Sequence, residues 1–325
     1  MKEIKWMTVA KAIGILLVVF GHSYPFEVDI PVFLDEVRNF IYCFHMPLFV
    51  FLSGYLITKL DSIGRKGPVG FIKKRAIRLL TPYFVLSILF FFPKIIASNY
   101  INDSVSFSFG YFLKTMLSPR DNVWGHFWYL PMLFGMTFFA VAYDFLLKKN
   151  RLIGAIAAIL SAGLIFLPAT TDWLSVDDIL HFLPWLLFGM CMGSFAWEEK
   201  AKKLWPLSPV LLLAAIGLFL LEIKYLKPII ALCIIGAVVL ISLKMRETKI
   251  IEYLGKNSFT IFILSWPFQA CTEILFNRVL HLPVLAVMPM MLLGGIIGPV
   301  LIIAIVRKLN KKFKLKYLKL TLGMN

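Results

Sequence analysis

The sequence predicts an all-α, polytopic membrane protein with about ten transmembrane helices and both termini in the cytoplasm. Hydrophobic residues make up 60% of the chain and charged residues only 16%, and the mean hydropathy is +0.83. A soluble globular domain usually has about 45–50% apolar and about 25% charged residues. The basic residues also collect in loops between apolar runs, which is typical of a multi-pass membrane protein.

The apolar runs give the expected spans in order along the chain, because a spanning helix needs about 20 mostly apolar residues. These runs are centred near Leu16, Phe49, Ile88, Gly135, Leu160, Leu187, Ala215, Gly236, Ile263 and Gly295.

The charge pattern orients the helices in the membrane. A net charge of +16 would suggest a nucleic-acid partner for a soluble protein, but here we expect the lipid bilayer as the partner and no nucleic acid. With the N-terminus inside, every large basic cluster falls on the cytoplasmic side, as the positive-inside rule predicts. We therefore divide the chain into a transmembrane domain, 1–310, and a basic cytoplasmic tail, 311–325, that lies along the anionic leaflet.

The cysteine pattern predicts free thiols. Cys43, Cys191, Cys233 and Cys271 all lie within apolar runs and not in metal-binding spacings. We expect four buried free thiols, with no disulfide and no metal site.

The first span, "KAIGILLVVFGH" (11–22), keeps two ionisable residues, Lys11 and His22. Ionisable groups inside a bilayer are costly, so each is a candidate functional residue. At about 100° and 1.5 Å per residue they share a face and lie about 16 Å apart, with Lys11 near the cytoplasm and His22 toward the outer side. Two interpretations stay open for Lys11, a functional role or snorkelling to the interface. His22 by itself could merely end the helix.

The second span, "CFHMPLFVFLSGYL" (43–56), carries another histidine, His45, near its outer end. His45 is expected about 10 Å below the outer surface, and His22 reaches a similar depth from the opposite direction. Pro47 is expected to kink this helix and free a carbonyl group. Two intramembrane histidines at one depth favour a functional pair over simple packing.

Arg75 and Arg78 stand three residues apart at the entry to the third span, so they share a helix face. Paired guanidinium groups suit phosphate binding through bidentate hydrogen bonds. Ordinary positive-inside topology also explains two arginines here, and from the residues alone it is the simpler interpretation.

The segment "WGHFWYLPMLF" (124–134) combines aromatic residues with a histidine at the predicted outer boundary. Trp128 and Tyr129 are typical of an interfacial aromatic belt. The alternative is a sugar-binding segment in which these rings stack on the sugar and His126 forms hydrogen bonds to it.

Together these motifs resemble the membrane-bound acyltransferase-3 family, in particular its smaller bacterial O-acetyltransferases of the fucose 4-O-acetylase type. The segments that carry the resemblance are 11–22, 44–56, 75–83, 127–134 and 254–267, in the family's order and over most of the chain. The resemblance implies a ten-helix protein of the bacterial cytoplasmic (inner) membrane. It also implies transfer of an acetyl group from cytoplasmic acetyl-CoA to a hydroxyl of a cell-envelope glycan or lipid-linked sugar.

The resemblance assigns roles to the candidate residues. Lys11 and His22 match the family's pattern of a basic residue, ten intervening residues and a histidine, and the arginine pair matches its acyl-CoA motif. We expect His22 to act as general base, and two routes stay open, direct transfer and an acetyl-histidine intermediate. The remaining expected roles are His45 in catalysis, Arg75, Arg78 and Lys11 in acyl-CoA binding, and His126, Trp128 and Tyr129 in acceptor binding.

Three positions depart from the family pattern: Thr8 replaces a common acidic residue, Ala12 a common glycine, and Ser265 a common histidine. Two other functional classes stay open beside the acetyltransferase. One is an exporter of a polysaccharide or lipid-linked sugar, which the absence of a clear inverted repeat disfavours. The other is a non-catalytic subunit of envelope assembly.

Overall fold

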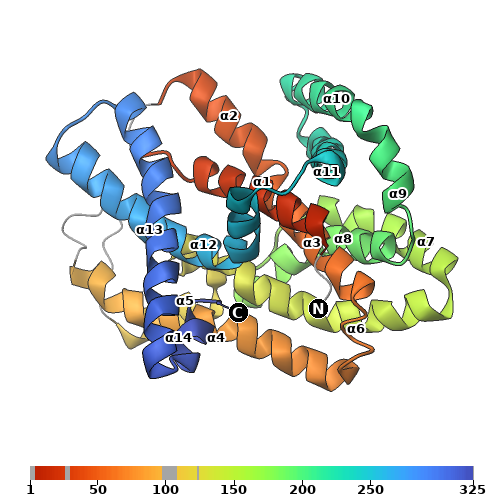
Figure 1. Ribbon diagram of the computed structural model, residues 1–325, viewed down its shortest axis with the longest axis horizontal. Helices are drawn as coiled ribbons and strands as arrows, with labels where there is room; N and C mark the ends of the chain where they lie inside the picture. Colours follow the sequence, from red (N-terminus) through yellow and green to blue (C-terminus); the bar gives the residue numbers. More distant parts are fainter. Residues whose placement is uncertain (1–3, 26–29, 97–107, 123, 325) are drawn as a thin grey trace. The chain divides into compact units, whose positions relative to one another are not determined.

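The computed structural model describes residues 4–25, 30–96, 108–122 and 124–324. Every regular element in these ranges is helical, and they contain no strand (Figure 1). The all-α class predicted from composition is therefore confirmed for the described residues.

Seven helical segments in the described ranges are long and apolar enough to cross a membrane. They span Val32–Lys59, Gly125–Lys149, Trp173–Gly193, Glu198–Leu220, Lys224–Lys244, Lys249–Val279 and Val284–Phe313. Each contains one predicted centre, so a multi-pass membrane protein is confirmed.

The three other predicted centres also lie in helices. Leu16 lies in α1 (Lys5–Gly21), Ile88 in α4 (Gly67–Ile96) and Leu160 in α7 (Arg151–Ser161). These helices are not among the seven, so the number ten and the cytoplasmic placement of both termini stay predictions.

The chain divides into two compact units, and the first comprises Met1–Leu52, Ala196–Leu315 and Met324. Here α1 packs against α11 (Lys227–Lys244) and α12 (Lys249–Glu273), α12 packs along α13 (Val284–Phe313), and α10 (Ser208–Leu220) packs along α11. A π-helix, Ile274–Val279, continues α12.

Glycines let the backbones of the first unit approach closely. A Cβ on Gly255 would lie 2.1 Å from the Thr8 carbonyl oxygen, so α1 and α12 cross with backbone against backbone. A Cβ on Gly295 would lie 2.7 Å from a Val19 methyl and 2.8 Å from the Gln269 side chain, which fixes α13 against both helices. Small residues at such crossings are the usual basis of helix association in a bilayer.

The second unit comprises Ser53–Phe195, Lys316–Gly323 and Asn325. Its frame is α6 (Tyr129–Lys149), which packs against α4 and α8 (Val176–Gly193), while α7 packs on both α6 and α8. A short helix, α5 (Phe109–Leu117), begins at Ser108, whose hydroxyl accepts a hydrogen bond from the Tyr111 amide.

The C-terminal segment is helical beyond the predicted domain boundary. Helix α13 continues through residue 310 to Phe313, and α14 (Lys316–Thr321) packs against α4 in the second unit. The division at 310 and the contact of the tail with the leaflet stay predictions.

The predicted second span, 43–56, lies in α3 (His45–Lys59) after a turn at Cys43 and Phe44, and a separate helix, α2 (Val32–Tyr42), precedes that turn. The expected kink at Pro47 was therefore wrong, because Pro47 stands in the first turn of α3. The backbone amides of a first turn have no partner within the helix, so a proline costs little there.

The four cysteines are free, as predicted, but the prediction that all are buried was wrong. Cys191 is buried, Cys43 and Cys233 are half-buried, and Cys271 is exposed. An apolar run places a residue at membrane depth, whereas helix rotation decides whether its side chain faces other helices.

We expect Gly255→Ala to destabilise the protein by about 1–3 kcal/mol, because the new methyl group forces apart a backbone crossing that has no flexible neighbour. Thermal unfolding of detergent-purified protein measures the effect. The matched control is Gly217→Ala, since a Cβ on Gly217 meets nothing within 4 Å. Equal melting temperatures for the two variants would contradict the close crossing of α1 and α12.

Candidate active site

The end of α1 forms one wall of the candidate site. His22 is the residue that caps the helix after Gly21. A Cβ on Gly21 would lie 3.0 Å from the Tyr42 ring, so glycine leaves room for that ring. The Tyr42 hydroxyl donates a hydrogen bond of 2.8 Å to the Gly21 carbonyl oxygen and lies 3.4 Å from His22 Nδ1.

This arrangement assigns a tautomer to His22. The Tyr42 hydroxyl has one proton, which it gives to the Gly21 carbonyl oxygen. It can therefore only accept a hydrogen bond from His22, which requires the proton of a neutral imidazole to be on Nδ1. The lone pair on His22 Nε2 is then available to take a proton from another group.

His45 has the same tautomer for an independent reason. Its Nδ1 lies 2.9 Å from the Ile41 carbonyl oxygen, and a carbonyl oxygen only accepts hydrogen bonds. The turn at Cys43 and Phe44 removes this carbonyl from the regular helical pattern, and the imidazole completes its bonding. The imidazole of His45 is buried, with Nε2 left as an acceptor.

The structure brings the two predicted histidines together. Their ring centroids are 6.4 Å apart, with the rings nearly perpendicular. The Tyr42 ring neighbours both, with centroid distances of 5.7 Å to His22 and 5.1 Å to His45. Trp266 of α12 approaches His22 to 5.9 Å from centroid to centroid. We call His22, Tyr42, His45 and Trp266 the histidine cluster.

Sequence reasoning missed Tyr42 and Trp266 as members of the cluster. Tyr42 stands three residues before His45, a spacing that would have suggested contact on one helix face. Trp266 follows Ser265, where the family often has a histidine. Ser265 itself is buried and donates to the Phe262 carbonyl oxygen of its own helix at 3.3 Å.

A buried amide fastens α12 to the end of α1. Gln269 Nε2 donates to the Val19 carbonyl oxygen at 2.7 Å and to Ser23 Oγ at 2.9 Å. Ser23 Oγ donates in turn to the Val19 carbonyl oxygen at 2.6 Å. These bonds flank His22 on both sides along the chain, so the position of its imidazole is set by helix packing as well as by Tyr42.

Lys11 and Thr8 of the first helix lie away from the histidine cluster. Lys11 is half-buried on α1, eleven residues before His22. Thr8 is buried, and its backbone meets Gly255 of α12, so the family's acidic position is here a packing position.

The arginine pair belongs to the second unit. Arg75 Nη2 donates to Ser53 Oγ at 3.1 Å, and its guanidinium carbon lies 5.5 Å from the Phe71 ring centroid. Its Nε is buried and, among the described residues, makes no hydrogen bond. Arg78, one helical turn later, is exposed. Arg75 thus combines a fixed position with an unused buried donor, as an anion-binding arginine requires.

The predicted aromatic residues lie in several contacts. Tyr129 is buried near Arg75, and its ring centroid lies 6.1 Å from that of Trp128. His126 packs edge-on against Phe127, with 4.7 Å between ring centroids. The role of His126, Trp128 and Tyr129 in acceptor binding stays a prediction.

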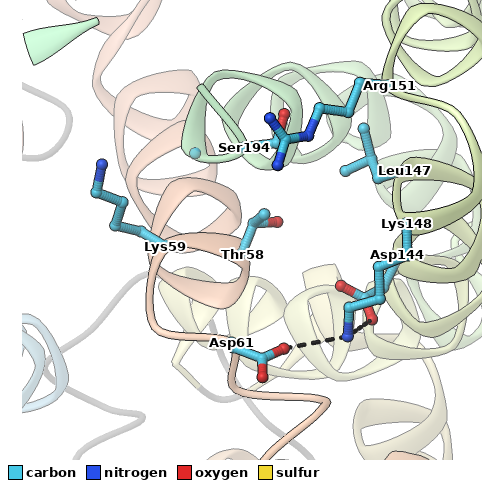
Figure 2. Close-up of a pocket in the computed structure, with 9 residues that line it drawn as sticks. Thr58, Lys59, Asp61, Asp144, Leu147, Lys148, Arg151 and Ser194 are labelled. Carbon is cyan, nitrogen blue, oxygen red and sulfur yellow. Dashed lines mark hydrogen bonds and ion pairs between the residues drawn. The ribbon is translucent and has the colours of Figure 1, made fainter. Parts of the chain in front are cut away.

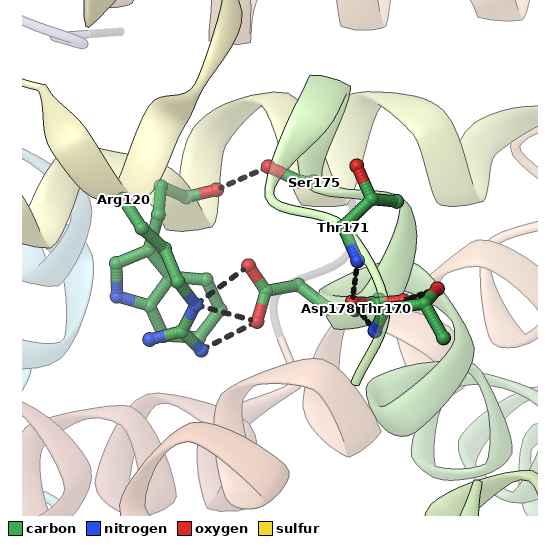
Figure 3. A network of polar contacts seen from close by, with 7 residues as sticks. Arg120, Thr170, Thr171, Ser175 and Asp178 are labelled. Atoms are coloured by element: carbon green, nitrogen blue, oxygen red, sulfur yellow. Dashed lines mark hydrogen bonds and ion pairs between the residues drawn. The ribbon is translucent and has the colours of Figure 1, made fainter. Parts of the chain in front are cut away.

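The Trp128 ring is already covered by protein groups, among them Arg120, whose ion pair with Asp178 is seen in Figure 3. The Arg120 guanidinium carbon lies 4.5 Å from its centroid, and the Phe182 ring centroid lies 5.4 Å away. Arg120 is held by buried Asp178, whose carboxylate accepts from Arg120 Nε at 3.0 and 3.1 Å. A stacked sugar would have to compete with these contacts, and no spacing in the sequence indicates this long-range ion pair.

In the described parts of the chain, no three His, Cys, Asp or Glu side chains lie close enough together to hold a metal ion.

Comparison with known proteins agrees with these observations. The sequence model of an acyltransferase family, described as "Acyltransferase domain", matches residues 4–321. The inner membrane protein YcfT of Escherichia coli (strain K12) is 24% identical to the chain over 295 residues, which covers 79% of this chain and 77% of that protein. No solved structure matches.

We expect Tyr42→Phe to remove the hydrogen-bond acceptor of His22 and so mix its two neutral tautomers. Nitrogen-15 NMR of histidine-labelled protein reports this directly, with His45 keeping its proton on Nδ1. Tyr24→Phe is the matched control, because the buried Tyr24 hydroxyl has no hydrogen-bond partner among the described residues. An unchanged His22 spectrum in Tyr42→Phe would contradict the tautomer assignment.

Proposed function

The chain belongs to the acyltransferase-3 family and is a multi-pass membrane protein, and from this premise we propose that it is an O-acetyltransferase. Its donor is cytoplasmic acetyl-CoA, and its acceptor is a hydroxyl of a cell-envelope glycan or lipid-linked sugar. It acts in the bacterial inner membrane, and the similarity to YcfT, an inner membrane protein of Escherichia coli, supports this location. Family membership does not favour the alternative of an exporter.

The observation that carries the proposal is the pairing of His22 with His45 in one cluster, each imidazole with its proton on Nδ1. A neutral imidazole with a free Nε2 is the usual general base near neutral pH. Tyr42 orients His22 as a third group orients the base in other acyl-transfer sites. Such an arrangement is unnecessary for packing alone.

The reaction that fits this cluster is attack of a sugar hydroxyl on a thioester. The hydroxyl oxygen forms a bond to the acetyl carbonyl carbon while His22 Nε2 takes the hydroxyl proton. The tetrahedral intermediate then collapses, the carbon–sulfur bond breaks, and the sulfur leaves as a thiolate. The proton on His22 passes to that sulfur, which yields the sugar ester and free CoA. His45 binds or orients the acceptor hydroxyl through its own Nε2.

The arginine pair supplies phosphate recognition in this proposal. Arg75 keeps a buried Nε donor that has no partner among the described residues, and Arg78 exposes a second guanidinium one turn away. Guanidinium groups match phosphate oxygens bidentately, and CoA carries several phosphate groups. Lys11, His126, Trp128 and Tyr129 keep the roles expected from the sequence, the first in donor binding and the other three in acceptor binding.

We expect His22→Gln to lower the rate of acetyl transfer by about 10²–10⁴-fold, because the general base is lost. The assay is release of CoA from acetyl-CoA with an extracted envelope glycan as acceptor, and melting temperature verifies the fold. His281→Gln, at an exposed histidine, is the control and keeps the wild-type rate. Full activity of His22→Gln would contradict the assignment.

We expect Arg75→Ala to raise the KM for acetyl-CoA by roughly 10–100-fold, the cost of removing a charge-assisted hydrogen bond to phosphate. Arg65→Ala, at an exposed arginine before α4, should leave KM unchanged. A normal KM in Arg75→Ala would remove the phosphate role from this residue.

A further inference from the structure

A row of polar side chains on α2 leads to the histidine cluster. We call it the α2 row, and it consists of Asp35, Arg38, Asn39 and Tyr42. Residues at these spacings share one face of a helix. At 1.5 Å per residue the row extends about 10 Å along the helix axis. Its last member, Tyr42, neighbours both imidazoles of the cluster. On the predicted topology the row therefore runs from the outer side of the membrane to the candidate base.

The side chains of the row are joined through the Asp35 carboxylate. Its Oδ1 pairs with Arg38, and its Oδ2 accepts a hydrogen bond from Asn39 Nδ2 at 3.1 Å. The Arg38 guanidinium carbon also lies 5.3 Å from the Tyr24 ring centroid. Because Tyr24 is the second residue after His22, this contact holds the row beside the end of α1.

The row is partly open and not sealed in the protein interior. The Asp35 side chain is 39% exposed and the Arg38 side chain 32% exposed, and Tyr42 is 41% exposed. A carboxylate has about four acceptor positions, and a guanidinium group has several N–H donors. The bonds within the row therefore leave hydrogen-bonding capacity on both charged groups, at places that a ligand can reach.

Helix stability alone is a weak explanation for this ion pair, because a partly exposed pair three residues apart contributes little. Charged side chains are also costly in a segment that is apolar enough to cross a membrane, and Val32–Lys59 is such a segment. Other ion pairs join separate elements, as Lys148 of α6 does with Asp61 after α3, beside a pocket of the second unit (Figure 2). The pair of Asp35 and Arg38 lies within α2, so a tie between elements does not account for it.

We propose that the α2 row is the acceptor subsite beside the histidine cluster and that it binds a neutral sugar. This inference rests on the proposed transfer of an acetyl group to a sugar hydroxyl. A hydroxyl group both donates and accepts hydrogen bonds. Adjacent hydroxyls of one sugar therefore match the pair, because one donates to the Asp35 carboxylate while the other accepts from the Arg38 guanidinium. The apolar face of the sugar ring packs on the Tyr42 ring.

The paired charges decide which sugars the row favours. The carboxylate and the guanidinium compensate each other, so a neutral sugar leaves their ion pair intact. An acidic sugar would draw Arg38 away from Asp35 and leave that carboxylate without its cation, which is unfavourable where both groups are partly buried. The length of about 10 Å exceeds one sugar ring, so the row also contacts the sugar unit next to the one that is acetylated.

Binding of oligosaccharides tests this subsite. Oligosaccharides released from the extracted envelope glycan are labelled with a fluorophore and separated by anion exchange into a neutral and an acidic pool. Full-length protein in nanodiscs is titrated into each pool, with fluorescence anisotropy as the readout. We expect Asp35→Asn and Arg38→Gln to weaken binding of the neutral pool by about tenfold or more, because each loses a hydrogen bond to a charged group.

A gain of binding separates recognition from a loss of folding. Asp35→Asn should bind the acidic pool more tightly than wild type does, because Arg38 is then free to pair with a sugar carboxylate, and a misfolded variant would not show this gain. Glu36→Gln is the matched control, since it removes a negative charge at an exposed position of the same helix. It should bind both pools within about twofold of wild type.

Wild-type affinity of both row variants for the neutral pool would overturn the proposal. A wild-type protein that binds no oligosaccharide, or that prefers the acidic pool, would also overturn it. Acetyl transfer to the same pools separates the subsite from the proposed function. If the row variants lose the neutral pool but the wild type releases no CoA with it, the subsite stands and the acetyl transfer fails. If wild type and row variants transfer acetyl groups with the same KM for the glycan, the subsite fails and the proposed function stands.

Discussion

The hydrogen bond between His45 and the Ile41 carbonyl is the interaction on which the rest of the candidate site depends. The Ile41 carbonyl oxygen accepts from the Phe44 amide at 3.1 Å in the turn between α2 and α3, and the His45 imidazole is its second donor. This bond ties the start of α3 to the end of α2, where Tyr42 reaches His22. The bond to Ile41 sets the tautomer of His45, and the bond from Tyr42 to the Gly21 carbonyl oxygen sets that of His22.

Glycine contacts and a buried amide keep this arrangement rigid. Gly21 admits the Tyr42 ring, Gly255 brings α12 against α1, and Gln269 fastens α12 beside Val19 and Ser23. In lipid the helices gain little from the hydrophobic effect, so close packing and hydrogen bonds between helices must hold them together. A base held in this way needs little reorganisation during proton transfer, which favours catalysis.

The cations of the second unit fall into two groups according to their partners. Arg120 and Lys148 are compensated by carboxylates and have structural roles, one over the Trp128 ring and one between α6 and the turn after α3. Arg75 is half-buried and has no carboxylate partner in the described residues. A partly buried cation is costly when it is unpaired, so this position is where an anionic ligand would be stabilising. The positive-inside rule explains the number of basic residues but does not distinguish these groups.

The sequence by itself determined the membrane class, the helical fold, the family, and the candidate residues His22, His45, Arg75 and Arg78. These follow from hydropathy and from short spacings, which are local properties of the chain. The tertiary structure decided the break before His45, the roles of Tyr42 and Trp266, the exposure of Cys271 and the covering of Trp128 by Arg120. Each of these depends on which donor meets which acceptor, and the bond from Gln269 to Val19 joins residues 250 positions apart. Hydropathy indicates which residues lie within the membrane but does not identify the partner of any side chain. Only the packing of the helices determines those partners.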